Sequence, residues 1–522
     1  MFRLSGRQPR LFSQRDFTGG LAFPGQTDAE AEQFEYLELG RDGYHISLLG
    51  SVKHNSAAIN ANQIVGIGRA NFSASGLVGD VILVAKKGVD WFRASANSAA
   101  PVAYTALTSP QDPLADVVRF EQANQLSGST NTAYVLFTNV NFTAIVQWDG
   151  NNANLPANIA GSPANCTLIR QGGARTFASG QAANPFTIYF SDANNPLSWP
   201  SNNFFNVPSS RGIVTGIERL SSGQMLIFTE RSILSLLGDV PLDFSLTMIQ
   251  EGIGCDQPRT ISTLGNTIVF AFQGDLYAYT GGISALTERL RGVTLLLPTN
   301  GVASNGFCAL TPNFLFYRPS ENTSTASPPV STTDQNTILH VFDRQRTGWW
   351  GVWKYATATG LGTSQPPQPV IYNLDNRLLL GGGDGTVYQQ TYRVVDTNNV
   401  LGTFETPTFT QDATTQNITA TYRSRLINLE DWGLQKTHGK IQIDGTCASG
   451  TGAITVRIIK ADGTATTASS SNLTFPTEVS SLGTTNTRFK AIQVQISGVD
   501  LQLFSYAIHW MPLALVSIQG NY

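Results

Sequence analysis

The chain alternates short apolar runs with polar turns, and almost nothing in it has helical period. No window places apolar residues at i, i+3, i+4 and i+7 over three turns. An apolar strand, a short polar turn and a second apolar or aromatic strand recur instead. The cores of the copies of this unit lie near Ile82, Val135, Ile188, Leu226, Val269, Leu315 and Leu379.

The spacing of these units favours one repeated architecture. Neighbouring cores are 38 to 64 residues apart, and a four-stranded propeller blade takes about 40–50 residues. A single blade cannot bury both of its faces, so blades stack around an axis. The pattern predicts an all-β protein with a β-propeller of about six or seven blades over residues 36–400, whose first and last strands can share a blade. A row of separate β-sandwiches is the alternative, because isolated hairpins look the same.

Beyond residue 400 the strands become longer and alternate more strictly. In IQIDG, ITVRI and IQVQI the apolar residues alternate with polar ones, as in sheets with one wet face. We therefore expect a separate C-terminal antiparallel domain, like a β-sandwich, over residues 401–522. Residues 1–35 are predicted to form an extended N-terminal arm.

Two glycine-containing turns carry a backbone prediction. Gly274 in FQGDLY and Gly385 in GGGDGTV each stand where two strands join. Hairpin turns of this kind require a positive φ, which glycine adopts without strain. GGGDG also lacks the Lys-Ser/Thr that follows the glycines of a phosphate-binding loop.

Composition and charge narrow the function classes. Charged residues make up 13% of the chain, against about 25% in an average globular protein, and polar uncharged residues and glycine replace them. The formal net charge is −3 and the isoelectric point is about 6.0. This disfavours a protein that grips nucleic acid over its whole surface, but it leaves open a pore along which DNA slides.

The cysteines and the apolar runs exclude two further classes. The four cysteines show no CxxC spacing, so we expect buried free thiols instead of a disulfide framework or a zinc site. The first apolar run is too short for a secretion signal, and no stretch of about 18 apolar residues predicts a membrane span.

No catalytic signature stands out, and we predict no catalytic, metal-binding or cofactor-binding residues. None of the five histidines has a metal-ligand spacing, and GxSxG, HExxH and P-loop motifs are absent. His340 lies in an apolar strand, ILHVF, and is expected in the core. Asp192, in SDANNPLSW, approaches the repeated box of sialidase-type propellers but lacks its glycine, so we expect it to cap a turn. The protein is predicted to be no enzyme.

Basic residues gather at the N-terminus. Arg3, Arg7, Arg10 and Arg15 precede the first acidic residue, Asp16. Arginine suits bidentate pairing with carboxylates or phosphates, so these four are candidate assembly contacts to a partner subunit or to the DNA backbone. A solvated tail is the alternative.

An aromatic cluster, TGWWGVW, contains Trp349, Trp350 and Trp353. These residues are a candidate aromatic surface on which a sugar ring could stack. Packing between strands of one blade is the alternative, and it is the favoured interpretation.

Two stretches resemble a known family. The first, over residues 16–55, opens with FTGGLAFPGQTDAEAEQFEYLELGRDGYHISLLGSVKHN. The second, over residues 185–285, contains IYFSDANNPLSW, then LIFTERSILSLLGD, GCDQPRTI and FAFQGDLYAYTGG in that order. They resemble the tail hub or nozzle proteins, also called packaged-DNA stabilisation proteins, of tailed double-stranded-DNA phages. None of these phrases is a catalytic motif.

The resemblance implies a structural virion protein in the phage tail. It implies a homo-oligomer, a hexameric ring below the portal and adaptor, that contacts other tail proteins, extends the DNA channel, retains the packaged genome and allows its ejection. DNA would pass without tight binding, since phosphate contacts add affinity and slow passage. A propeller glycosidase and a sugar-binding, receptor-binding tail protein are the alternatives.

Overall fold

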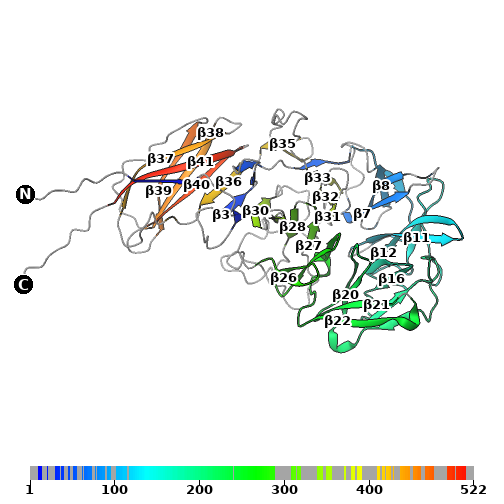
Figure 1. Ribbon diagram of the computed structural model, residues 1–522. Helices are drawn as coiled ribbons and strands as arrows, with labels where there is room; N and C mark the ends of the chain where they lie inside the picture. The colour runs from blue at the N-terminus through cyan, green and yellow to red at the C-terminus, as the bar shows by residue number, and fades with distance from the viewer. Residues whose placement is uncertain are drawn as a thin grey trace, which may run out of the picture.

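In a computed structural model (Figure 1), strands and turns make up the described part of the chain. The structure describes residues 10–14, 20–21, 30–35, 37–39, 45–47, 51–55, 62, 64–72, 77, 79–86, 88, 91–95, 102–113, 117–238, 240–287, 307–312, 314–318, 338–344, 348–354, 369–371, 378–381, 385–390, 408–411, 414–417, 419–424, 427, 436–446, 451–459, 465–474, 491–499 and 501–512. Within them, no helix is long and apolar enough to cross a bilayer.

Seven antiparallel four-stranded units follow one another along the described chain. The first three are β7 (Ile64–Phe72), β8 (Gly79–Lys86), β9 (Trp91–Ser95) and β10 (Thr105–Leu107); β11 (Arg119–Ser127), β12 (Thr130–Thr138), β13 (Val146–Trp148) and β14 (Ala157–Asn158); and β15 (Leu168–Gly172), β16 (Arg175–Ser179), β17 (Thr187–Phe190) and β18 (Phe204–Asn206). In each of them, consecutive strands pair as neighbours, which is the meander of a propeller blade.

The next four units repeat this order. They are β19 (Val214–Arg219), β20 (Met225–Thr229), β21 (Ser232–Leu237) and β22 (Ser245–Glu251); β23 (Ser262–Leu264), β24 (Thr267–Phe272), β25 (Asp275–Tyr279) and β26 (Ile283–Ala285); β27 (Phe307–Leu310), β28 (Phe314–Arg318), β29 (Ile338–Asp343) and β30 (Gly348–Lys354); and β31 (Pro369–Ile371), β32 (Leu378–Gly381), β33 (Val387–Gln390) and β6 (Ser51–Lys53). We number these units blades 1 to 7.

The first strands of the blades form a closed ring. β7 contacts β11, β11 contacts β15, β15 contacts β19, β23 contacts β27, β27 contacts β31, and β31 returns to β7. Thr263 of β23 joins β19 through a hydrogen bond to Glu218, which completes the circle. The fold is therefore a seven-bladed propeller whose first strands line the axis.

Apolar side chains fill the spaces between successive blades. Clusters of buried residues lie between blades 1 and 2, 2 and 3, 3 and 4, and 4 and 5, and a larger one joins blades 5, 6 and 7. Ile64 and Ile82 of blade 1 pack against Leu379 and Val387 of blade 7. The last interface of the ring is thus apolar too, because each blade has two faces to bury.

The sequence units coincide with the blades one for one. Six of the seven predicted core positions lie on the second strand of a blade. The exception, Ile188, lies on β17, the third strand of blade 3. That offset explains the uneven spacing on either side of it.

Blade 7 takes its outermost strand from the opposite end of the chain. β6 pairs antiparallel with β33, in the register Gln389↔Val52. The main-chain N–H of His54 extends this ladder by donating to Val387 O at 2.7 Å. The predicted sharing of one blade by the first and last propeller strands is confirmed.

A second antiparallel domain lies at the far end of the molecule from blades 1 to 4 (Figure 1). One sheet contains β1 (Arg10–Gln14), β4 (Leu37–Leu39), β5 (His45–Ser47), β37 (Lys436–Thr446) and β41 (Gln502–Pro512); the other contains β36 (Thr419–Ser424), β38 (Thr451–Ile459), β39 (Ala465–Thr474) and β40 (Ala491–Val499). Buried Tyr422 and Tyr506 meet between the sheets, with their hydroxyls 3.4 Å apart. This is the expected C-terminal sandwich. A separate hairpin joins β34 (Thr408–Gln411) to β35 (Thr414–Asn417).

N-terminal strands connect the two domains. β2 (Gly20–Leu21) pairs with β30 of blade 6, and β3 (Glu30–Glu35) pairs with both β30 and β36. Blue β3 therefore lies between the propeller and the C-terminal strands (Figure 1), and blade 6 continues into a ten-stranded sheet. The sequence predicted a domain boundary at residue 35. The structure has none there, because strands on both sides of residue 35, β1 and β3 before it and β4 and β5 after it, belong to sheets that contain C-terminal strands.

Both predicted turn glycines have positive φ. The values are 86° at Gly274 and 78° at Gly385. Gln273, which precedes Gly274, also has a positive φ of 51°. Two successive positive φ values define a type I′ turn, which suits the twist of a two-residue hairpin.

Candidate functional site

A network of charged side chains crosses four consecutive blades at the ring of first strands. Arg170 on β15 lies between Glu121 on β11 and Glu218 on β19. Its Nη1 donates to Glu121 Oε2 at 2.9 Å, and its Nη2 donates to Glu218 Oε2. Thr263 Oγ1 on β23 donates to the same Glu218 oxygen at 2.9 Å. We call Glu121, Arg170, Glu218 and Thr263 the axial network.

Burial sets the electrostatics of the axial network. The side chains of Glu121 and Glu218 are 12% and 9% exposed, and that of Arg170 is 30% exposed. Burial raises the pKa of Glu121, although Arg170 and the main-chain N–H of Gln171 oppose the rise. Burial alone would lower the pKa of Arg170, but the charges of Glu218 and Glu121 outweigh it and raise that pKa.

This geometry suits a clamp better than acid–base chemistry. Both carboxylates are engaged by one guanidinium, so neither is held ready to exchange a proton with a bound substrate. The guanidinium instead ties the first strands of blades 2, 3 and 4 to one another. Charge-assisted hydrogen bonds of this kind fix geometry as well as supplying energy.

A second arginine spans the propeller axis. Arg119, the first residue of β11 in blade 2, donates from Nη2 to Pro258 O at 3.1 Å. Pro258 begins the short 3-10 helix η3 (Pro258–Thr260), which leads into blade 5. Blades 2 and 5 are three positions apart in a ring of seven, so the contact reaches across the centre. A duplex cannot pass through a centre that this side chain and main-chain carbonyl bridge.

Buried polar atoms gather just before η3. Asp256 Oδ2 accepts a hydrogen bond from the Gln273 N–H at 2.9 Å, while Oδ1 is buried and has no partner among the described residues. Gln257 is fully buried, and neither its amide nitrogen nor its amide oxygen has a described partner. Burial raises the pKa of Asp256.

No metal centre forms within the described part of the chain, since it contains no cluster of three potential ligands. The neighbouring thiol is also unreactive: burial raises the pKa of Cys255 to about 12, which keeps it protonated. Cys166 and Cys308 are likewise buried and free, as predicted. Cys447 lies outside the described residues.

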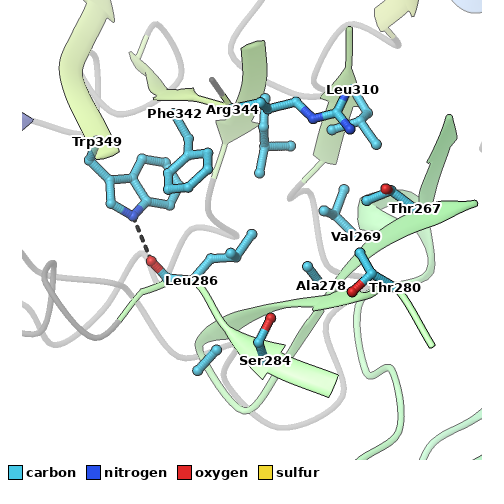
Figure 2. A pocket seen from close by; sticks show the side chains of 12 residues that line it. Thr267, Val269, Ala278, Thr280, Ser284, Leu286, Leu310, Phe342, Arg344 and Trp349 are labelled. Carbon is cyan, nitrogen blue, oxygen red and sulfur yellow. Dashed lines mark hydrogen bonds between the residues drawn. The ribbon is translucent and has the colours of Figure 1, made fainter. Parts of the chain in front are cut away.

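A cavity of about 410 Å³ lies between blades 5 and 6 (Figure 2). Its apolar wall consists of Val269, Ala278, Leu310, Leu315, Phe342 and Trp349. Arg344 lies along one side, and Thr280 and Ser284 line the opposite side (Figure 2). We call this space the blade 5/6 pocket. An apolar cavity with few polar groups at its rim suits an apolar ligand or side chain.

The prediction of an aromatic surface is wrong for Trp349. Its side chain is 1% exposed, its indole N–H donates to Leu286 O at 2.7 Å, and Phe342 packs edge-on against it. It joins blade 6 to blade 5, which confirms the packing alternative for this residue. Trp350 and Trp353 belong to β30, but their side chains lie outside the described part.

Of the four candidate arginines of the N-terminus, only Arg10 lies in the described part of the chain. Arg10 is the first residue of β1, where its backbone pairs with that of Trp510 in β41. Residues 10–14 therefore pair with the C-terminal domain of their own chain. Arg3, Arg7 and Arg15 lie outside the described residues.

Two residues considered for chemistry have the structural roles expected of them. Asp192 caps its turn by accepting hydrogen bonds from Ser198 Oγ at 2.7 Å and Asn203 Nδ2 at 3.3 Å. His340 is buried against Tyr317 and Trp349, and burial lowers its pKa to about 4.

The axial network was missed from the sequence, although a signal for it exists. Glu121 and Arg170 are 49 residues apart, and Arg170 and Glu218 are 48 apart. One blade therefore separates each pair. Residues of opposite charge that are about one blade apart in the sequence, and that lie on the first strands of neighbouring blades, are expected to meet. This pattern would have predicted the contacts of Arg170 with Glu121 and Glu218.

Comparison with known proteins assigns no family. No family model matches the chain, and no curated protein matches it. Among solved structures, the extracellular domain of a putative one-component system of B. thetaiotaomicron, BT4673, is similar at 11% identity and a TM-score of 0.43, over 66% of this chain. The chain spans 40% of the length of that protein.

Two lyase structures are similar at the same level. A streptogramin B lyase matches 66% of this chain and 98% of its own, at 11% identity and a TM-score of 0.41. The virginiamycin B lyase of Staphylococcus aureus matches 66% and 99%, at 10% identity and a TM-score of 0.40. Similarity this distant carries no argument about function. The propeller architecture is therefore assigned from the strand pairing described above.

Proposed function

We propose that this chain is a non-enzymatic structural protein of a phage tail. Six copies would form the ring of a tail nozzle, or hub, below the portal and adaptor. The ring would extend the DNA channel, retain the packaged genome and open for ejection. The proposal rests on the sequence resemblance, and the fold is compatible with it.

The observation that carries the proposal is where the shared phrases lie. The phrases of the second stretch, residues 185–285, occupy turns and contacts of blades 3, 4 and 5. In FTERSI the Thr229 hydroxyl accepts the Ser232 N–H at 2.9 Å. In GCDQPRT the Cys255 N–H donates to Thr229 O at 2.8 Å, so the two phrases meet. Phrases that build blades and join them support a resemblance in the scaffold itself.

The axis of a single propeller cannot be the proposed DNA channel. The Arg119–Pro258 contact crosses it, and the axial network narrows the same ring of strands. A channel for duplex DNA therefore has to lie outside each propeller, enclosed by several copies. Six chains of formal charge −3 would carry about −18 together, and such a wall repels phosphates and lets DNA slide.

The sugar-binding alternative loses one of its three proposed residues. Trp349 is buried and hydrogen-bonded to the main chain, so it offers no face to a sugar ring. We therefore do not propose a sugar platform that includes it.

The proposal is tested by imaging the purified full-length chain and by following it into particles. Negative-stain images and native mass are expected to show a closed ring of six copies. Phage that lack the chain should package DNA and then lose it.

The double variant Arg3→Ala/Arg7→Ala tests the arm without removing β1. It should keep the wild-type melting temperature and reduce incorporation into particles. A chain that stays monomeric and is absent from purified virions would refute the nozzle assignment.

A further inference from the structure

A hydrophobic prong projects from the outer hairpin of blade 4. Leu237, the last residue of β21, is 49% exposed, and in the loop to β22 Val240 is 48% and Leu242 98% exposed. Such a cluster on one loop is uncommon, since a soluble protein usually keeps its large apolar side chains covered. We call Leu237, Val240 and Leu242 the blade 4 prong.

The described backbone from Val240 to Asp243 forms a defined turn that carries Leu242. Pro241 and Asp243 bound the 3-10 helix η2 (Pro241–Asp243), whose Asp243 N–H donates to Val240 O at 2.9 Å. Gly238 has a φ of 99°, a conformation that most residues avoid. A preorganised loop loses little entropy when it binds.

The blade 5/6 pocket complements this prong in size and polarity. At about 410 Å³ it has room for roughly a dozen water molecules, and its wall is apolar. Phe342, Trp349 and Leu315 line the pocket and would contact an inserted leucine side chain. Removing such a side chain from water favours the contact.

The two surfaces also complement each other in charge. Arg344, at the pocket, donates to Thr311 O at 2.6 Å and makes no ion pair with a described residue. Asp243, next to Leu242, is exposed and likewise makes no ion pair within the described part of the chain. Each surface therefore carries the charge that the other lacks.

We propose that the prong of one copy inserts Leu242 into the blade 5/6 pocket of a second copy, where Asp243 pairs with Arg344. The contact is heterologous, since the prong and the pocket are different surfaces. Heterologous contacts repeat head to tail and close into a ring when the rotation permits. This inference rests on the proposed function in one respect: it supplies the interface between neighbouring copies of the proposed ring.

Two variants remove opposite halves of the contact. Leu242→Glu places a charge where an apolar side chain should be buried. Ser284→Trp fills the pocket from an exposed position of β26, where a larger side chain can be accommodated. Leu155→Glu, at a 62% exposed residue of blade 2, and Asn131→Trp, at an exposed residue of β12, are the matched controls.

Sedimentation of the full chain gives the decisive result. Wild type and both controls should self-associate, and each variant alone should weaken self-association by about 30-fold or more. A mixture of the two variants should form dimers and nothing larger. One partner then supplies an intact prong and the other an intact pocket, so a single contact is restored.

Three results would overturn the contact: a monomeric wild type, variants that assemble like wild type, or a mixture that stays monomeric. If rings of six form and Leu242→Glu leaves them intact, the contact fails while the nozzle function stands. If wild type forms prong-dependent oligomers but is absent from virions, the contact stands and the nozzle function fails.

Discussion

At the scale of single residues, Arg170 joins the first strands of three neighbouring blades through its own side chain. Its guanidinium meets a carboxylate from the blade before it and another from the blade after it. Each of those carboxylates also accepts a further hydrogen bond, from Gln171 N–H and from Thr263. The network therefore depends on one positive charge held between two negative ones.

We predict that Arg170→Met destabilises the propeller at pH 7. Removing one partner of a fully buried ion pair costs about 3–5 kcal/mol. Because 30% of the Arg170 side chain is exposed, we expect a smaller loss, about 2 kcal/mol. Chemical denaturation at pH 7 measures it, with Arg211→Met, whose partner Glu251 is largely exposed, as the control.

The same variant should show a change in pH dependence. Loss of Arg170 raises the already elevated pKa of Glu121 further. A carboxyl group whose folded pKa is raised binds more protons in the folded state, so stability falls as pH rises through the window between its two pKa values. The defect of Arg170→Met should therefore shrink as pH is lowered from 7 toward 5. A defect that is constant over this range would contradict the assignment.

At the scale of one element, the β24–β25 hairpin joins a local turn to a contact within its blade. Phe272 pairs with Asp275 across a two-residue loop in which Gln273 and Gly274 both have positive φ. The Gln273 N–H, freed from the ladder, donates to Asp256 Oδ2. The turn thus holds the carboxylate that precedes η3.

We predict that Gly274→Val destabilises the protein by about 1–3 kcal/mol, the cost of a side chain held in a strained backbone conformation. Gly385→Val should act in the same direction, since its φ is also positive. The control is Gly282→Val, where an added Cβ meets nothing within 4 Å and φ is not positive. Thermal melts of the three variants decide the matter, and equal losses would argue against strain as the cause.

At the scale of the whole molecule, strands from the N-terminal region hold the ring and the two domains together. β6 completes blade 7, and β2 and β3 connect blade 6 to the C-terminal sheet. A propeller closed by a strand from its other end cannot open one interface without breaking a hydrogen-bonded ladder. Such closure suits a part that has to resist load, because unfolding then requires strand separation.

We predict that Val52→Pro weakens this closure while Lys53→Pro is tolerated. The His54 N–H points toward β33, and N–H groups two residues apart in a strand point the same way, so Val52 also donates into the sheet. Proline at Val52 removes that bond at a cost of about 3 kcal/mol. At Lys53 the N–H faces away from β33, so proline there leaves the β6–β33 ladder intact. Similar melting temperatures for the two variants would contradict closure through β6.

Local patterns determined much of this protein. The two-residue alternation and the polar turns predicted an all-β chain, seven hairpin units and a C-terminal sandwich, because each of these depends on residues close together in the sequence. The positive φ of Gly274 and Gly385 and the cap by Asp192 followed for the same reason. Turn chemistry depends on a few neighbouring residues and needs no knowledge of the remaining chain.

Only the tertiary structure decided which distant strands meet. The sequence placed Arg10 in an arm and favoured packing of Trp349 within one blade. In the structure β1 pairs with β41, and Trp349 also joins blade 6 to blade 5. The axial network joins residues from four blades, and each looks like an ordinary polar residue of a strand until the ring closes. Period and propensity describe one strand at a time, while the pairing of strands hundreds of residues apart depends on the apolar faces that all the blades must bury together.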